Sequence, residues 1–498
     1  MIKTRLKVEE FKEFSFGKFR EKLPLSNLLE NQFKYFNRYM SIVDNDHMFK
    51  VDIDADYQTR DIFEISLHKT LKELFPFTSV KGNVHLEYAG FSLGRPIYTE
   101  EECRDKKLTY SRPLRLKFRL TFLDKDDVSG EMKPYQSKED EIFLMNFPMI
   151  TQRGTFIING AERIVVSQLH RSPGVTFTEQ EGILDINGQK LFTTTIIPYY
   201  GSWLEFTMDT LRVLYVLLDR KKKAPGTILL RAFGMSTADI LRKFYATKKV
   251  NAKTFKRKVG VPMIVVDDVI TSKGDVILNA GDDLNDFEIS FPEDVKKIEI
   301  VDPDKITQTT IIDTLKKDVT KNTDEARKVI YNKLRPGYSY SKQMADNYFE
   351  ALYFNAEKYS FSYVGRYQIN KRLKQQEQVS EDILTLTESD VINTINELLD
   401  IRESLDITDD IDNLANRRVR MVHEQLDVVI RSSMLKQKRN VVEKLGSNDI
   451  EGNSVLDIFH TRHIEASIND FFARSQLSQF MDEINPLATM THLRRLSA

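Results

Sequence analysis

The C-terminal stretch of the chain places hydrogen-bonding and apolar side chains within a few residues of one another. Serine, glutamine, aspartate, asparagine, histidine and arginine alternate there with phenylalanine, methionine and leucine, over residues 475–487 and 491–498. A surface loop usually carries fewer apolar groups, and a core segment carries fewer groups that donate or accept hydrogen bonds. The mixture is typical of a polar pocket that grips a ligand.

Two further clusters combine arginine with other polar groups. Arg163 and residues 167–174 (Ser-Gln-Leu-His-Arg-Ser-Pro-Gly) are either a loop with ordinary surface charges or an edge that contacts bases or phosphates, since arginine offers a planar fork of donors. In residues 409–420, carboxylates precede a basic stretch that we expect to begin a helix, with Arg417 and Arg420 on one face. The alternative for this second cluster is an intramolecular ion-pair network.

The single tryptophan, Trp203, directly follows Gly201 and Ser202. A lone tryptophan is most often a core residue, but one beside a glycine turn can stack on an unpaired base, which contributes about 1–3 kcal/mol. Residues 219–223 (Asp-Arg-Lys-Lys-Lys) are either a solvated turn or a weak phosphate contact.

The usual catalytic signatures are missing from the sequence. It contains no phosphate-binding loop ending in Gly-Lys-Ser/Thr, no HExxH and no GxSxG. His460 and His463 could share a helical face, but no third zinc ligand lies nearby. We therefore predict no catalytic residue and no metal site in this chain.

Composition limits the class of protein. A length of 498 residues suggests about three domains. The 73 lysines and arginines nearly balance the 74 aspartates and glutamates, so any contact with nucleic acid must come from local patches. Cys103 is the only cysteine, which excludes an intrachain disulfide and fits a reducing compartment. With no signal peptide and no apolar run long enough to span a membrane, we expect a cytoplasmic protein.

The elements that must position these residues include both helices and strands, so we predict an α+β, mixed multi-domain fold. Residues 114–122 alternate apolar and mostly basic side chains, which indicates a half-buried strand, and Asn159-Gly160 is typical of a hairpin turn. Residues 250–305 read as a small β-rich insertion. Helices dominate residues 310–445, with one apolar face from Val391 to Leu399 and another that ends before Pro336-Gly337.

Several long runs, in collinear order, resemble the N-terminal part of the beta subunit of bacterial DNA-directed RNA polymerase. The matching runs are residues 154–163 (GTFIINGAER), 166–174 (VSQLHRSPG), 197–204 (IPYYGSWL), 334–337 (LRPG), 409–418 (DDIDNLANRR) and the C-terminal stretch from Ser475.

The resemblance implies a domain organisation. Residues 1–158 and 422–478 would form a discontinuous protrusion domain, with the lobe, residues 159–421, nested inside it. The insertion at 250–305 would lie within the lobe. Residues 479–498 would begin the fork region and break off inside the rifamycin-pocket motif.

The resemblance also implies contacts with the opened DNA. Trp203 would stack on an unpaired base of the non-template strand, and Arg171, Asp412, Leu414 and Arg417 would line a pocket for a flipped guanine. Asp219 would belong to the same DNA-binding surface. Ala415 stands where the family commonly has glycine.

The rifamycin pocket and the adjacent path of the nascent RNA are implied at a third set of residues. These are Val166, Gln479, Phe480, Asp482, His492, Arg495 and Ser497. Leu493 stands where the family usually has a polar residue, at a position we expect to be peripheral.

In this family the Mg²⁺ ions are held by the beta-prime subunit, so no cofactor is expected in this chain, and the fragment alone would be inactive. The implied partners are beta-prime, the alpha dimer, omega and sigma, promoter and downstream DNA, nascent RNA and rifamycin antibiotics, but no membrane. The alternative function is a non-catalytic docking module for sigma and regulators. A stand-alone nucleotidyltransferase is disfavoured, because no carboxylate cluster for Mg²⁺ is recognisable.

Overall fold

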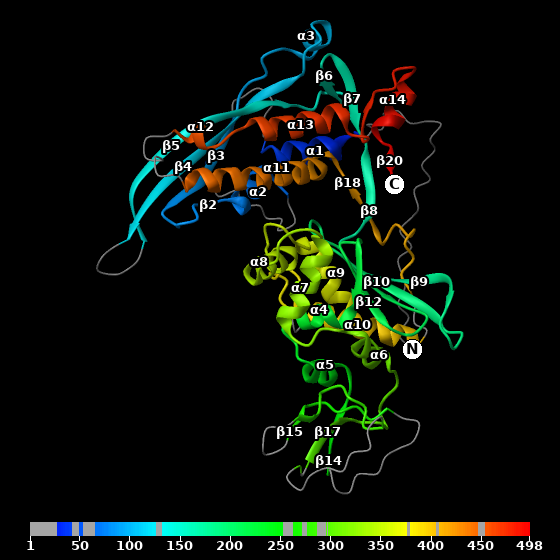
Figure 1. The fold of residues 1–498 in the computed structure, drawn as a ribbon. Helices are drawn as coiled ribbons and strands as arrows, with labels where there is room; N and C mark the ends of the chain where they lie inside the picture. The colour runs from blue at the N-terminus through cyan, green and yellow to red at the C-terminus, as the bar shows by residue number, and fades with distance from the viewer. Residues whose placement is uncertain are drawn as a thin grey trace, which may run out of the picture.

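The computed structural model describes residues 27–41, 49–52, 65–125, 132–251, 262–270, 276–285, 295, 297–375, 379–404, 408–446 and 454–498. Helices and strands are mixed along this whole length, and helices pack against open antiparallel sheets (Figure 1). The predicted α+β class is therefore confirmed. None of the described helices is both long and apolar enough to cross a bilayer.

The first body, at the top of Figure 1, is built on a long antiparallel sheet of order β1-β3-β4-β5, with β2 also paired to β3. The strands are β1 (Phe49–Asp52), β2 (Phe77–Thr78), β3 (Val84–Leu93), β4 (Ser111–Lys125) and β5 (Met132–Pro148). The helices are α1 (Glu30–Tyr39), α2 (Leu67–Leu74), α3 (Glu100–Asp105), α11 (Val422–Leu445), α12 (Val455–Ile458) and α13 (Arg462–Arg474). Its core combines residues 36–165 with residues 422–472, so the chain leaves this body and returns to it.

The strand predicted at 114–122 is confirmed as part of β4. Its apolar side chains are buried, and its basic side chains lie on the opposite face. There Arg119 and Lys117 pair with Glu139 of β5 at 2.7 and 3.4 Å. This basic face is therefore neutralised within the sheet, which leaves little positive charge for a ligand.

The second body contains a five-stranded meander of order β13-β12-β11-β10-β9. The strands are β9 (Gly174–Leu184), β10 (Lys190–Ile197), β11 (Leu204–Met208), β12 (Leu214–Leu218) and β13 (Lys222–Pro225). The helices are α4 (Gly226–Ala232), α6 (Thr310–Lys317), α7 (Thr323–Leu334), α8 (Lys342–Tyr353), α9 (Ser362–Arg372) and α10 (Glu388–Ser404).

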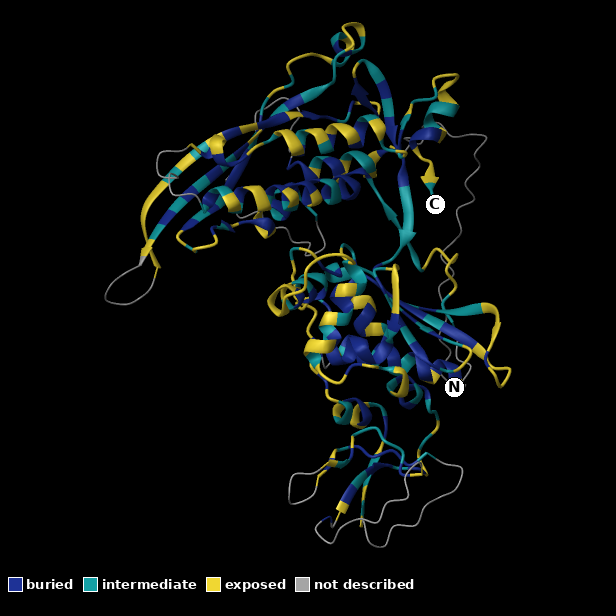
Figure 2. Cartoon of the chain, in the orientation of Figure 1, coloured by how far each residue is buried: buried dark blue, intermediate teal, exposed yellow. Residues whose placement is uncertain are grey.

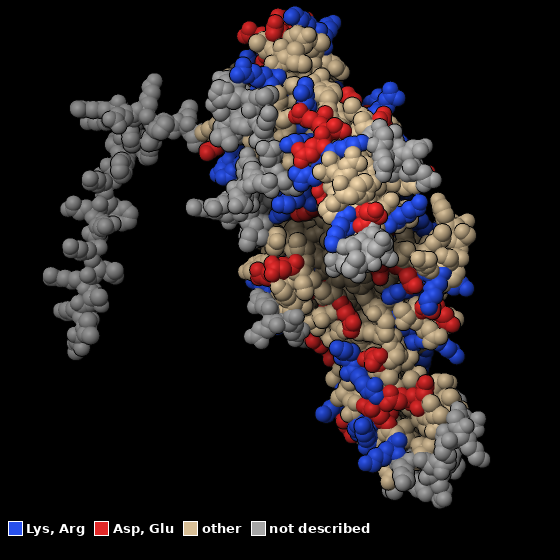
Figure 3. Space-filling view, turned by 90° about the vertical axis from the view of Figure 1, so that its left-hand side faces the viewer, with Lys and Arg blue, Asp and Glu red and all other residues tan. Residues whose placement is uncertain are grey.

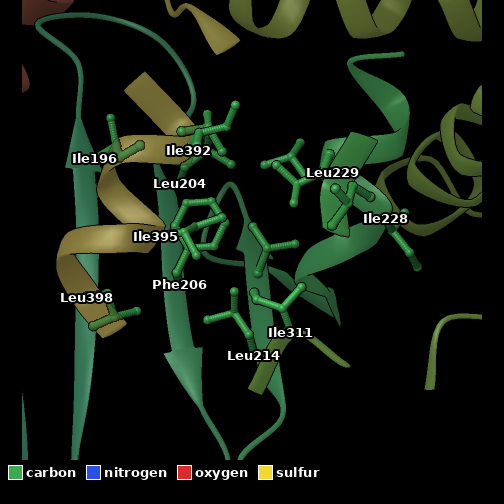
Figure 4. Close-up of a cluster of buried hydrophobic side chains, with 14 of the residues drawn as sticks. Ile196, Leu204, Phe206, Leu214, Ile228, Leu229, Ile311, Ile392, Ile395 and Leu398 are labelled. Atoms are coloured by element: carbon green, nitrogen blue, oxygen red, sulfur yellow. The ribbon is translucent and has the colours of Figure 1, made fainter. Parts of the chain in front are cut away.

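The two apolar helical faces predicted in this body are confirmed. Figure 4 shows Ile392, Ile395 and Leu398 of α10 against the sheet side chains Ile196, Leu204 and Phe206, all of them buried. Helix α7 ends at Leu334, before Pro336-Gly337, as predicted. The core of this body draws on residues 175–401.

A smaller unit lies below the second body in Figure 1. It follows α5 (Thr237–Phe244) and contains β14 (Thr247–Asn251), β15 (Val269–Ile270), β16 (Val276–Leu278) and β17 (Lys297–Val301), around its own apolar cluster. Short strands thus occur in the segment predicted as a β-rich insertion, part of which lies outside the described residues.

Short strands connect the two large bodies. They are β6 (Phe156–Ile158), β7 (Ala161–Val165), β8 (Ser167–Arg171), β18 (Arg417–Arg420), β19 (Ser478–Phe480) and β20 (Leu496–Ser497), with α14 (Pro486–Leu493) between the last two. The predicted Asn159-Gly160 hairpin is confirmed between β6 and β7, with φ of +51° and +79°. Figure 2 shows β8, which runs from one body toward the other, mostly as intermediate in burial, whereas the interiors of both bodies are buried. Side chains on β8 are therefore accessible.

Candidate nucleic-acid interface

The strand pair β8–β18 brings two of the predicted DNA-binding residues together. The two strands are antiparallel, and Arg171 lies directly opposite Arg417. Opposed side chains in such a pair project to the same face with Cβ atoms about 4.5–5.5 Å apart. Both arginines are half-buried, and neither makes an ion pair with any described residue. Two unneutralised cations in this position repel each other, so the pair favours an anion between or above them.

The prediction of a helix that begins near Arg417 is wrong. Residues 417–420 form β18, and the next helix, α11, starts only at Val422. Side chains alternate along a strand, so Arg417 and Arg420 project to opposite faces instead of sharing one. Pairing with β8, almost 250 residues earlier in the chain, provides the backbone hydrogen bonds that hold this segment extended.

The predicted ion-pair network exists, but it involves the neighbouring residue. Arg418 pairs with Glu424 of α11, and its guanidinium lies 5.7 Å from the ring centroid of Tyr199. His170 stands opposite Arg418 on β8. Burial, together with the charges of Arg418 and Arg420, lowers the pKa of His170 to about 4, so this imidazole is neutral near pH 7. Arg418 is therefore a structural cation, whereas Arg417 forms no ion pair within the described part of the chain.

The side chain of Trp203 is half-buried and stacks on Arg220. It is therefore neither a fully buried core residue nor a fully open ring. The guanidinium carbon of Arg220 lies 3.5 Å from the centroid of the indole ring. Arg220 is held there by a tight turn in which Asp219 and Arg220 both have positive φ, and the Asp219 amide donates to the Trp203 carbonyl at 3.0 Å. Burial lowers the pKa of Arg220, and the nearby charge of Arg171 lowers it further. Arg171 and Arg220 are therefore near enough for their charges to interact.

Gly201 fixes the approach of the chain to Trp203. Its φ is +126°, and a Cβ placed on it would lie 2.6 Å from the ring of Tyr359. Only glycine fits this position without displacing neighbouring backbone.

The remaining residues of the predicted DNA surface are more open. Asp412 and Leu414 lie on an exposed loop, where Leu414 keeps 70% of its surface accessible. The loop is attached next to Arg171, because the Ser172 amide donates to the Asn416 carbonyl at 3.1 Å. Asp219 pairs with Lys221 at 2.5 Å, so its carboxylate is already occupied. Arg171, Trp203 and Arg417 are thus brought together, Asp412 and Leu414 lie on an adjoining loop, and Asp219 acts through the turn that holds Arg220.

Two of the C-terminal candidates, Gln479 and Asp482, contact His492 on α14. The Nε2 atom of His492 lies 3.1 Å from the side-chain oxygen of Gln479, and its Nδ1 accepts from the Asp482 amide at 3.3 Å. Burial is the larger cause of a lowered pKa of His492, to which Arg495 adds. A neutral imidazole therefore links β19 to the following loop.

The next residue of β19 after Gln479, Phe480, presents an exposed aromatic ring. Phe480 is 64% exposed, and the guanidinium of Arg163 lies 4.1 Å from its ring centroid. Arg163 also donates to the Ser478 carbonyl at 3.2 Å. Sequence reasoning placed Arg163 in a polar cluster but did not connect it with Phe480; the register of β7 against β19 makes that connection.

An apolar cluster supports the C-terminal candidates from beneath. Val166 is 1% exposed and packs with Leu29, Ile164 and Leu493. Leu493, which stands where the family usually has a polar residue, is only 5% exposed within this cluster. An apolar side chain is favoured there because the position faces a core.

The two groups of candidates share strand β8, the central strand of the sheet β18-β8-β20. Ser497 lies beside Gln168 on one side, and Arg417 lies opposite Arg171 on the other. Gln168 and Arg171 are three residues apart, which corresponds to about 10 Å along a strand.

On the face that Figure 3 shows, acidic and basic side chains are interspersed, and this view shows no extended basic patch. Within the described ranges, no group of three or more His, Cys, Asp or Glu side chains is arranged to hold a metal ion.

Residues 292–420, which contain β17, α6 to α10 and β18, match the family model of RNA polymerase Rpb2, domain 2. The matched range includes Asp412, Leu414 and Arg417 of the interface. The match supports a role in transcription, with the chain as a second-largest subunit of a DNA-directed RNA polymerase.

Proposed function

We propose that this chain is the N-terminal part of the beta subunit of a bacterial RNA polymerase, and that it holds opened DNA and the transcript while beta-prime carries the catalytic metal. The observation that carries the proposal is the placement of Arg171 directly opposite Arg417, with Arg171 near enough for its charge to interact with Arg220, which stacks on Trp203. In this proposal, the first body is the protrusion, 1–158 with 422–478, and the second is the lobe, 159–421.

The chemistry of the interface suits a displaced single strand. The opposed arginines would neutralise phosphates, and the indole and guanidinium planes would accept an unstacked base. The Asp412 carboxylate can accept hydrogen bonds from the Watson–Crick N–H groups of a flipped guanine. Moving a base out of its stack costs a few kcal/mol, which such contacts can offset.

A guanine scan through bubble-containing DNA tests this role in the assembled polymerase. We expect Trp203→Ala to weaken binding of the bubble about tenfold, because stacking contributes roughly 1–3 kcal/mol per base. We expect Asp412→Ala to reduce the preference for guanine at one position. Asp105→Ala, an exposed carboxylate on α3, is the control. An unchanged base preference in both variants would leave the docking-module alternative as the better account.

The proposal also assigns a rifamycin pocket on the nascent-RNA path to the surface around His492. Val166, Gln479, Phe480, Asp482, Arg495 and Ser497 complete it. A neutral imidazole between Gln479 and Asp482, next to an exposed aromatic ring, supports this assignment because such pockets combine apolar walls with a few fixed polar groups.

Substitutions at this surface should weaken inhibition by rifamycin in the full subunit. His492→Tyr adds volume to a nearly buried site and removes the link to Gln479, and Ser497→Leu replaces a polar group with a larger apolar one. We expect at least about a tenfold rise in the inhibitory concentration, which corresponds to the loss of one or two hydrogen bonds. Asp470→Ala, on the exposed face of α13, should leave inhibition unchanged. Normal inhibition of both pocket variants would refute the assignment.

The remaining parts of the proposal concern the assembly. The partners are beta-prime, the alpha dimer, omega and sigma, and the assembly is located in the cytoplasm. The isolated chain has no polymerase activity. Nucleotide incorporation by the purified chain would overturn this division of labour.

A further inference from the structure

A cavity of about 660 Å³ lies where the two large bodies meet. Its walls come from α1, α2 and the start of α11 in the first body, and from residues 199–200 and 356–364 in the second. Arg171, Trp203 and Arg417 do not line it. The cavity is therefore a separate feature from the nucleic-acid interface, and its volume is in the range of small-molecule sites, which often lie between domains.

The walls are rich in aromatic rings. Tyr35, Tyr199, Tyr200, Tyr363 and the imidazole of His423 all contribute. The ring of Tyr35 is stacked on His423, with centroids 5.4 Å apart and an interplanar angle of 11°. The guanidinium of Arg431 lies 4.5 Å from the centroid of Tyr200. Planar groups already stack in this lining, which favours a flat ligand.

The charges of the lining balance one another. Four cationic side chains, Arg38, Lys69, Arg418 and Arg431, face four carboxyl groups, Glu73, Glu357, Glu424 and Asp427. The strongest cations are engaged, because Arg418 pairs with Glu424, and Arg431 lies 2.7 Å from Glu73. Such a lining does not attract a polyanion, since little net positive charge remains for phosphates.

The deepest titratable groups of the lining have shifted pKa values. Burial raises the pKa of the Glu424 and Asp427 carboxyl groups, a shift that Arg418 and Arg431 oppose, and burial lowers the pKa of His423 to about 4. The imidazole of His423 is therefore neutral near pH 7, and it can donate or accept hydrogen bonds without the penalty of burying a charge.

Four side-chain atoms of the lining lack a hydrogen-bond partner within the described part of the chain: the hydroxyl of Tyr199, Nδ1 of His423, Oε2 of Glu424 and Nε of Arg431. Glu424 and Arg431 are held in ion pairs with Arg418 and Glu73, which leaves the Tyr199 hydroxyl and Nδ1 of His423, whose side chain is about nine-tenths buried. Buried polar atoms without a partner are costly, so each favours a guest that completes its hydrogen bonding.

We propose that this cavity binds a small, uncharged, planar nitrogen heterocycle of about the size of a purine nucleoside without phosphate. One face of the heterocycle packs along the Tyr35 side of the cavity, and its ring nitrogens and exocyclic groups hydrogen-bond to the polar groups around His423. The inference does not rest on the proposed role in transcription.

Calorimetric titration of the 498-residue chain with adenosine and inosine tests the proposal, with ATP as the charged counterpart. We expect saturable binding of at least one nucleoside and much weaker binding of ATP. Tyr35→Ala removes a wall residue that is already 37% exposed, so the fold should tolerate it. This variant should weaken nucleoside binding about tenfold, the scale of losing one stacking partner.

Two further variants complete the test. His423→Phe keeps a ring against Tyr35 but removes both ring nitrogens, and it should also weaken binding. Tyr367→Ala, at an exposed tyrosine of α9 outside the cavity, should not. A cavity that holds only water would bind neither nucleoside at millimolar concentration, and that result would overturn the proposal. Tighter binding of ATP than of adenosine, or equal binding by the Tyr35→Ala variant, would overturn it as well.

Discussion

Replacing Arg171 and Arg417 together by glutamine is expected to weaken binding of bubble DNA by roughly tenfold for each arginine, since charge-assisted hydrogen bonds contribute about 1.5–3 kcal/mol. The slope of log affinity against log salt concentration should also become shallower by about 0.7 for each phosphate contact that is lost on a single strand. Titrations of the assembled enzyme at several salt concentrations measure both quantities.

Stability provides an independent readout for the same variants. Because two like charges directly opposite each other in a strand pair are destabilising, removing both should leave the melting temperature of the free chain unchanged or slightly raised. Arg95→Gln, at an exposed arginine of the first body, is the control and should alter neither the slope nor the stability. An unaltered salt slope, or a clear fall in melting temperature, would show that the arginine pair is structural.

Replacing Asp390 by alanine is expected to destabilise the second body by about 3–5 kcal/mol, the usual cost of leaving a buried charge without its partner. Asp390 and Arg366 are both fully buried, with Nη1 and Oδ1 2.6 Å apart. Arg366 also donates to the carbonyls of Ile383 and Thr385, so the network joins α9 to the segment before α10.

Hydrogen exchange is the appropriate measurement, because a chain with several bodies need not unfold in one step. Amides of α9 and α10 should lose protection in the Asp390→Ala variant, while those of β4 in the first body should not. Asp382→Ala, at an exposed position nearby, is the control. A double variant, Arg366→Met with Asp390→Leu, should recover much of the loss, because it removes both charges and leaves apolar volume. Equal protection in Asp390→Ala and the parent chain would contradict the prediction.

Local patterns in the sequence were sufficient where one element buries one face. The alternation at 114–122 predicted β4, and the spacing from Val391 to Leu399 predicted the buried face of α10. In both cases the period of the apolar residues matches the geometry of the element, and the local preference agrees with the tertiary environment.

The sequence misled where distant segments determine the local structure. Residues 417–420 carry three arginines and one valine, a pattern with no strand signal, and only the pairing with β8 makes them a strand. The contact of Arg220 with Trp203 likewise depends on the pairing of β11 with β12, which returns the chain to the tryptophan 17 positions later. No single stretch of the sequence indicated the cavity between the two bodies, because its lining comes from distant segments.

The position of β8 between β18 and β20 has an evolutionary consequence. Under the roles proposed above, a substitution selected at Ser497 acts through β20 on the same strand that presents Arg171. We therefore expect lineages that adapt on one edge of this sheet to carry compensating changes on the other.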